Sequence, residues 1–180
     1  MTARANTCPI CGEGRLREQV GTNRVAYRDQ STELELHYSV CDSCGSEQSD
    51  AAQLRANKRA MVAFKKKVDG LLSGEEVRRI RERLGLSQAE AARVFGGGPV
   101  AFSKYESNDV AQSEAMDKLL RLAAEVPEAF CYLRRMAGFA ETNVAVWASM
   151  PNVASQKASR HLRLISTSGP AGQQDWRKSA

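Results

Sequence analysis

The sequence predicts an α+β protein that is mainly helical, with a small β-containing module at its N-terminus. Two observations lead to this fold class. First, two short motifs of the form Cys-x-x-Cys-Gly, at 8–12 and 41–45, enclose a segment in which apolar and polar residues alternate as in a β-strand. Second, from Ser73 onward the chain shows short amphipathic segments bounded by serine and glycine, which are typical of small capped helices.

Length and composition fit two small domains rather than one large domain. The 180 residues carry a formal net charge of +5, which mildly favours an acidic partner. No segment has the roughly 18 consecutive apolar residues of a membrane span, and the N-terminus lacks the apolar core of a signal peptide. We therefore expect a cytoplasmic protein without membrane contact, in which thiols stay reduced. The predicted boundaries are 1–69, 70–137 and a C-terminal extension at 138–180.

Four of the five cysteines have the spacing of a metal site. Each Cys-x-x-Cys-Gly motif forms a tight loop with two thiolates on one side, and two such loops supply four soft ligands. A catalytic zinc keeps one position open and usually has histidine or carboxylate ligands, whereas a redox dithiol needs one motif only. The sequence thus predicts one structural Zn²⁺ per chain, bound by Cys8, Cys11, Cys41 and Cys44.

The segment between the motifs predicts a β-hairpin. Leu34, Leu36, Tyr38 and Val40 alternate with Glu33, Glu35, His37 and Ser39, which is the pattern of a half-buried strand. We expect a partner strand near 24–28 and a turn at 29–31. The hairpin would bring the two cysteine motifs together.

A basic helix is predicted at 51–68. We expect Leu54, Met61, Phe64 and Val68 to pack on the metal module. The basic side chains either contact phosphates or form an ordinary solvated face; they are Arg55, Lys58, Arg59, Lys65, Lys66 and Lys67. Asp69-Gly70 is expected to end the helix and to form a short hinge between the domains.

Two capping boxes begin the next two helices. Ser73 with Glu76 and Ser87 with Glu90 have the spacing in which each side chain caps the other's backbone amide. The glycines at 96–98 predict a turn, and Pro99 suits the first turn of the following helix. A P-loop is excluded, because the lysine and hydroxyl residue of that motif are absent.

The helix that begins at Pro99 has the composition of a DNA recognition helix. Phe102 and Tyr105 are spaced to face the core, which leaves a small, polar outer side that suits a major groove. Gln88 is either a phosphate contact or part of the helix cap. The predicted DNA-binding residues are Gln88, Pro99, Val100, Ala101, Ser103, Lys104 and Ser107.

Two further helices complete the five of this domain. Ser113 caps the first, and Pro127 begins the second. Cys131 lies in the second helix without a partner thiol and is expected to be a small buried residue. Beyond it, 138–180 is rich in small and polar residues and is expected to be loosely structured, with short ordered pieces at 144–147 and 161–165.

The residues from Leu86 to Glu106, LSQAEAARVFGGGPVAFSKYE, resemble the DNA-binding half of the MqsA-type antitoxins. The two cysteine motifs, the Ala63-Phe64-Lys65 segment and the Asp117–Arg121 stretch extend the resemblance to residues 7 to 136. It implies a zinc-stabilised repressor that dimerises through its C-terminal domain and binds a palindromic operator in double-stranded DNA. In many members of the family the N-terminal module also binds a toxin.

Two positions depart from the family pattern. The family carries asparagine and arginine as base-contacting side chains, where this sequence has Val100 and Lys104. We therefore expect a different operator sequence. Three function classes follow: an autoregulating antitoxin, a stand-alone transcription regulator of prophage or other origin without a toxin, and an enzyme that uses zinc or thiols. The enzyme is the weakest, because the only histidines, His37 and His161, lie far apart and no open metal site is predicted.

Overall fold

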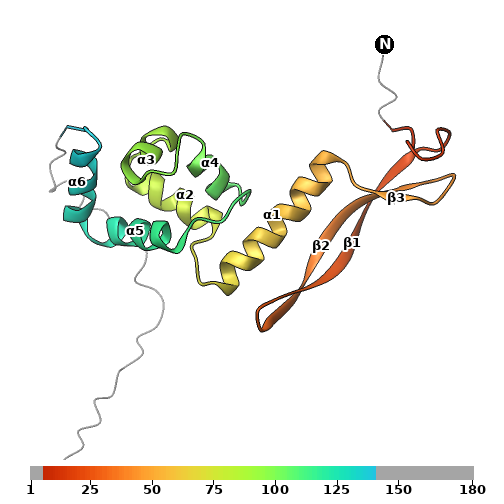
Figure 1. The fold of residues 1–180 in the computed structure, drawn as a ribbon, viewed down its shortest axis with the longest axis horizontal. Coiled ribbons are helices and arrows are strands. Elements are labelled where there is room, and N and C mark those ends of the chain that lie inside the picture. The colour runs from red at the N-terminus through yellow and green to blue at the C-terminus, as the bar shows by residue number, and fades with distance from the viewer. Residues whose placement is uncertain (1–5, 141–180) are drawn as a thin grey trace, which may run out of the picture. The chain divides into compact units, whose positions relative to one another are not determined.

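A computed structural model describes residues 6–140, which lie within one compact unit of the chain. The order is a three-stranded sheet followed by six helices (Figure 1), as expected for a mixed α+β fold. The elements are β1 (Leu16–Tyr27), β2 (Gln30–Cys41), β3 (Glu47–Gln48), α1 (Ala51–Val68), α2 (Gly74–Arg83), α3 (Gln88–Phe95), α4 (Ala101–Glu106), α5 (Glu114–Glu125) and α6 (Pro127–Met136). The pieces predicted at 144–147 and 161–165, and all of the predicted extension beyond residue 140, lie outside the described residues.

The hairpin is longer than the sequence indicated. β1 pairs with β2 in antiparallel register from Leu16↔Cys41 to Tyr27↔Gln30, so the partner strand begins well before the predicted 24–28. The turn is Arg28-Asp29 rather than 29–31, and Arg28 has a φ of 50°. A two-residue hairpin turn needs this left-handed backbone. Most of β1 is exposed, and it therefore lacks the alternation that made β2 recognisable.

The alternation predicted for β2 holds in its first half only. Leu34 and Leu36 are partly buried between the exposed Glu33 and Glu35. Ser39 breaks the pattern, because it is 6% exposed and accepts a hydrogen bond from Gln53 Nε2 at 2.9 Å. A polar partner on α1 therefore satisfies a position that alternation assigned to solvent.

Helix α1 begins with a capping box of Asp50 and Gln53. The predicted apolar stripe is wrong at Leu54, which is 58% exposed, whereas Phe64 is buried. Gln53 takes the inward place, since its amide reaches Ser39. The amide of Asn57 bonds both backbone groups of His37, so polar contacts attach the N-terminal half of α1 to β2.

The helical half has an apolar core formed by α2 to α6. Both predicted capping boxes are present, with Ser73 paired to Glu76 and Ser87 paired to Glu90. Ser113 caps α5, and Pro127 is the first residue of α6, as predicted. The buried core residues are Leu72, Val77, Leu84, Leu86, Ala91, Ala92, Val94, Phe95, Phe102, Leu120, Ala123 and Phe130.

The stretch predicted as a hinge is bonded to α5. Gly70, with a φ of 69°, ends the turn after α1, and its carbonyl accepts from Arg121. Leu72 is buried in the core, and its amide donates to Asp117 Oδ1 at 2.7 Å. The change of direction at Asp69-Gly70 is therefore present, but specific hydrogen bonds fix the residues that follow it.

Candidate metal centre and nucleic-acid interface

The hairpin places the two cysteine motifs together. At the open end of the hairpin, Leu16 pairs with Cys41. The Cys8 amide donates to Gly14 O at 2.7 Å, which folds the first motif back on β1. Each motif closes on its glycine: Gly12 N bonds Cys8 O, and Gly45 N bonds Cys41 O. Both glycines have φ near 70°, a conformation that disfavours other residues.

The four sulfur atoms form a cluster of the size that a tetrahedral metal requires. The Sγ atoms of Cys8, Cys11, Cys41 and Cys44 all lie within 4.8 Å of one another and could hold a metal ion. Two cross-motif pairs are closer, Cys8–Cys44 at 3.8 Å and Cys11–Cys41 at 3.7 Å. A Zn–S bond of about 2.3 Å gives a tetrahedral edge of about 3.8 Å. The donor set fits a closed, four-coordinate ion.

Backbone amides surround the sulfurs. Gly14 N donates to Cys11 Sγ at 3.4 Å, while Ser43 N and Cys44 N donate to Cys41 Sγ. These donors stabilise thiolates and fix their direction. Gly14 must lack a side chain, because a Cβ there would overlap Cys41 Sγ.

The thiols of Cys8 and Cys41 have pKa values that are shifted in opposite directions. The Ser46 hydroxyl, followed by backbone amides, lowers the pKa of Cys8 to about 6. For Cys41 the Cys44 amide acts in the same direction, but desolvation and the neighbouring thiols raise the pKa to about 11. Four thiolates this close repel one another. A bound dication would offset much of that repulsion.

Ser46 and Gln48 contact the cluster but were not found from the sequence. Ser46 Oγ lies 3.4 Å from Cys8 Sγ and 3.2 Å from Cys44 Sγ, and Gln48 Nε2 lies 3.7 Å from Cys8 Sγ. Both follow the second motif directly. Their spacing alone carries no signal, because their side chains reach the sulfurs only once β3 pairs with β2.

Helices α3 and α4 enclose the glycine turn in the predicted arrangement. Phe102 is fully buried and contacts Phe95 and Tyr105, with ring centroids 5.9 Å apart in both pairs. The turn uses positive φ at all three glycines, 96–98. A Cβ on Gly97 would come within 2.9 Å of the Ala101 side chain. Aromatic packing and this turn therefore fix α4 against α3.

The structure places the predicted DNA-binding residues in three different environments. Pro99 and Val100 are exposed in the turn before α4. Val100 is the N-cap of α4 and does not lie within the helix. Ser103 and Lys104 are exposed on α4, while Ser107 is half-buried and donates to Asp109. Ala101 is 5% exposed, so the prediction that it is solvent-facing is wrong. The helix begins two residues later than Pro99, which turns Ala101 toward the core.

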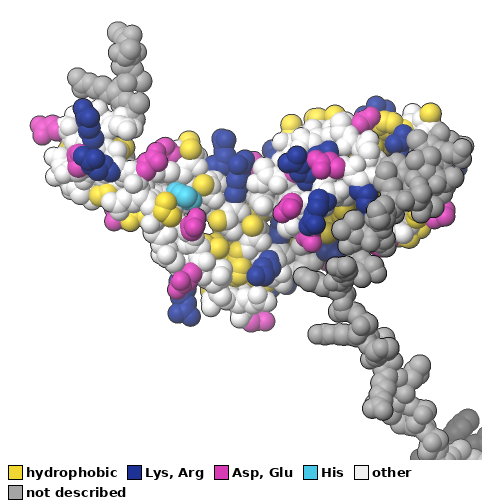
Figure 2. All heavy atoms as spheres, turned by 180° about the vertical axis from the view of Figure 1, so that it is seen from behind, with side chains coloured by type: hydrophobic (Ala, Val, Ile, Leu, Met, Phe, Trp, Pro, Cys, Tyr) yellow, Lys and Arg dark blue, Asp and Glu magenta, His cyan; other side chains and the backbone are white. Residues whose placement is uncertain are grey.

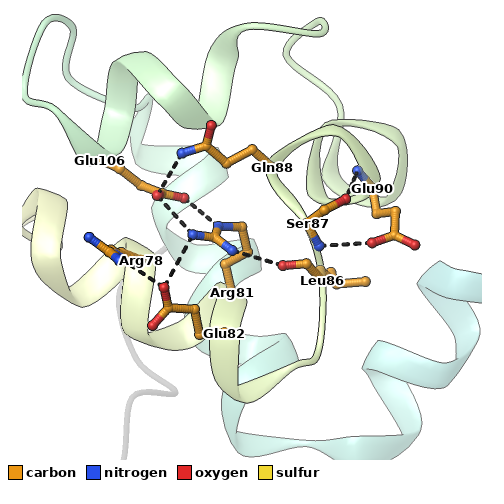
Figure 3. Close-up of polar contacts among 8 residues, drawn as sticks. All are labelled: Arg78, Arg81, Glu82, Leu86, Ser87, Gln88, Glu90 and Glu106. Atoms are coloured by element: carbon orange, nitrogen blue, oxygen red, sulfur yellow. Dashed lines mark hydrogen bonds and ion pairs between the residues drawn. The ribbon is translucent and has the colours of Figure 1, made fainter.

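Gln88 belongs to a polar network beside α4 rather than to the helix cap (Figure 3). Its amide donates to Glu106 Oε2 at 2.9 Å. Arg81 donates to the same carboxylate through two nitrogens, at 2.5 and 3.0 Å, and through its third nitrogen to Leu86 O. The arginine and glutamate side chains are 10% and 7% exposed. Glu106 raises the pKa of Arg81 still further. This network joins α2, α3 and the end of α4.

The basic residues of α1 do not form one uniform patch. Lys66 is 1% exposed, and Arg59 forms an ion pair with Asp109. Arg55, Lys58 and Lys67 are exposed. On the face shown in Figure 2, Lys and Arg side chains are interspersed with acidic ones. Among residues 6–140, no helix is long and apolar enough to cross a membrane.

Comparison with known proteins gives a family for this combination of cysteine cluster and helical half. A family model described as the antitoxin component of a bacterial toxin–antitoxin system, MqsA, matches residues 6–134. The antitoxin MqsA of Escherichia coli strain K12 is 31% identical over 129 residues, which span 67% of this chain and 94% of the relative. The expected resemblance is thereby confirmed, and the chain belongs to the MqsA antitoxin family.

Proposed function

We propose that this chain is the antitoxin of a toxin–antitoxin pair and that it represses its own operon by binding DNA in the cytoplasm. Family membership supports the antitoxin role. The N-terminal module, 1–69, would bind the toxin, and 70–137 would bind DNA and dimerise. No catalytic function is assigned.

The metal in the cluster is proposed to be one structural Zn²⁺. The four-sulfur donor set and the cross-motif separations near 3.8 Å support it, since zinc prefers tetrahedral thiolate sites. Cys8, Cys11, Cys41 and Cys44 would hold the ion, and its chemistry would be limited to cross-linking the two motifs.

The outer face of α4 is the observation that carries the DNA-binding proposal. Phe102 faces the core, whereas Ser103 and Lys104 on this short helix and Val100 at its N-cap are exposed directly after a tight glycine turn. Small polar side chains allow such a helix to enter a major groove. Lys104 can donate to guanine, and Val100, 54% exposed, can contact a thymine methyl.

A dimer is proposed because palindromic operators require two-fold symmetry. Exposed apolar side chains gather on α5, α6 and the residue between them. Leu122, Val126, Tyr132 and Met136 are 49%, 37%, 57% and 70% exposed. Apolar side chains this exposed on two consecutive helices favour contact with a second copy of the chain.

Lys104→Ala tests the DNA-binding proposal. We expect affinity for the DNA upstream of the gene to fall by about 1 to 3 kcal/mol, because one base contact is lost. Lys118→Ala is the matched control, since Lys118 is equally charged but lies on α5 paired with Glu114. Fluorescence anisotropy measures both. Equal affinities for Lys104→Ala and wild type would remove Lys104 from the interface.

A stand-alone regulator without a toxin is the second candidate, because DNA binding through α4 does not depend on a toxin. Co-expression with any small reading frame found next to the gene separates the two. A stoichiometric complex that purifies on the tagged antitoxin is expected. DNA binding without any such complex would favour the stand-alone regulator.

A further inference from the structure

Lys66 is the charged residue among the largest fully buried side chains described, and its partners identify a role. It lies near the end of α1, the helix that leads out of the metal module. Its Nζ donates to Tyr105 O at 2.8 Å and to Asn108 Oδ1 at 3.1 Å. Both acceptors are at the C-terminal end of α4. A buried ammonium group is costly unless it is hydrogen-bonded, and these two acceptors are its partners, so this placement is specific.

The carbonyl end of α4 favours a positively charged partner in addition to the backbone amides that bond it. The last carbonyls of a helix have no intrahelical donor, and the helix dipole makes that end negative. Asn108 follows in a left-handed conformation, with a φ of 58°. Gly74 packs so close to this end that a Cβ there would overlap Glu106 O. The chain therefore encloses the end of α4, and Lys66 supplies its positive charge.

A second contact joins the same two elements. Arg59, two turns earlier on α1, binds Asp109 through two nitrogens, at 2.7 and 3.2 Å. The amide of Asp109 in turn donates to Lys104 O at 2.9 Å. Arg59 lowers the pKa of Asp109 to about 2, so the carboxylate stays ionised. Two cationic side chains of α1 thus bind the segment that ends α4.

We propose that Lys66 is a positioning residue for DNA recognition, which holds the C-terminal end of α4 and so sets how Val100, Ser103 and Lys104 are presented. The proposal rests on the proposed function in one respect, namely that α4 contacts DNA. It also gives α1 a second role. Besides covering β2, this helix connects the metal module directly to the recognition helix.

The test is Lys66→Met, which keeps the length and apolar stem of the side chain but removes the donors. Lys67→Met is the matched control, because Lys67 is exposed on the same turn. We expect the affinity of Lys66→Met for the upstream DNA to fall at least ten-fold, while affinity for unrelated DNA of equal length stays within two-fold. The Lys67→Met variant should lower both affinities alike, and by no more than about two-fold.

A second measurement, hydrogen exchange in the absence of DNA, reports on the stability of α4 itself. In Lys66→Met, hydrogen exchange at the amides of Lys104, Ser107 and Asp109 should accelerate at least ten-fold, while the α5 amides and the metal content stay unchanged. A purely structural role would lower thermal stability and both DNA affinities together, leaving their ratio at the wild-type value. That constant ratio, or unchanged exchange in α4, would overturn the proposal.

Asn108→Gly covers the case in which Lys66→Met does not fold. Glycine accepts the left-handed backbone but removes one of the two acceptors, so a smaller loss of specific affinity, about three-fold, is expected. An unchanged affinity would overturn the proposal. If wild-type protein does not distinguish upstream from unrelated DNA, the proposed function fails on its own, and the exchange at α4 still decides whether Lys66 holds that helix.

Discussion

The N-terminal module with the four cysteines, 1–69, and the helical half formed by α2 to α6 are stabilised in opposite ways. In the helical half, twelve buried residues form one apolar core. In the module, the buried side chains are two cysteines, the polar or charged Ser39, Gln53 and Lys66, and Phe64, while most of β1 is exposed. A small domain without a core depends on a cross-link, here four sulfurs at one end of a hairpin. The two halves should therefore fail under different perturbations.

The largest effect should come from Cys41→Ser. Removing one of four ligands leaves an incomplete shell, so the metal should be lost and the hairpin should unfold, because binding and folding are linked in such modules. Metal analysis should fall from one ion per chain to none, while NMR signals of Val77, Phe102 and Leu120 persist. A variant that retains full metal, or one that loses both halves together, would contradict separate stabilisation.

Phe102→Ala perturbs the other half. Its side chain is fully buried between Phe95 and Tyr105, so the cavity should cost about 3 to 5 kcal/mol of unfolding free energy. Urea denaturation monitored on the helical signal measures this loss. The metal content should stay at the wild-type value. Release of metal at urea concentrations that unfold only the helices would show that the halves are not separately stabilised.

A smaller effect, about 3 kcal/mol, is expected for Glu106→Ala. It removes the two-nitrogen contact of the Arg81 side chain, which is 10% exposed and keeps only a longer contact of 3.5 Å to Glu82; this is unfavourable because a buried charge needs a close partner. Glu114→Ala, which removes the exposed partner of Lys118, is the control and should change stability far less. Equal losses in the two variants would show that the Arg81–Glu106 pair is no more than a surface contact.

Local signals in the sequence predicted much of this fold. The capping serines at 73, 87 and 113 and the cysteine spacing each depend on residues a few positions apart, and the structure has them all. Most errors arose where contact with a residue distant in the sequence decides whether a side chain is buried. Ser39 is buried by Gln53, and Lys66 is buried by the end of α4. Ala101 is a different case, because there the start of α4 was placed two residues too early.

The residues of the candidate site show the same difference between local signals and distant contacts. The sulfur ligands could be named from spacing, because two short loops define them. Ser46, Gln48 and the Gln88–Glu106 contact could not, since each depends on how separate elements pack. For the proposed base-contacting positions the family resemblance indicated Val100 and Lys104, and both side chains are exposed in the structure.

The proposed function requires that the helical half recognise a palindromic operator as a dimer, with α4 supported from the metal side through α1. A DNase footprint of the wild-type protein on the DNA upstream of its gene is the decisive experiment. We predict one protected region with two-fold symmetry and half-sites about 10 base pairs apart. No protection, or a footprint without two-fold symmetry, would contradict the proposal.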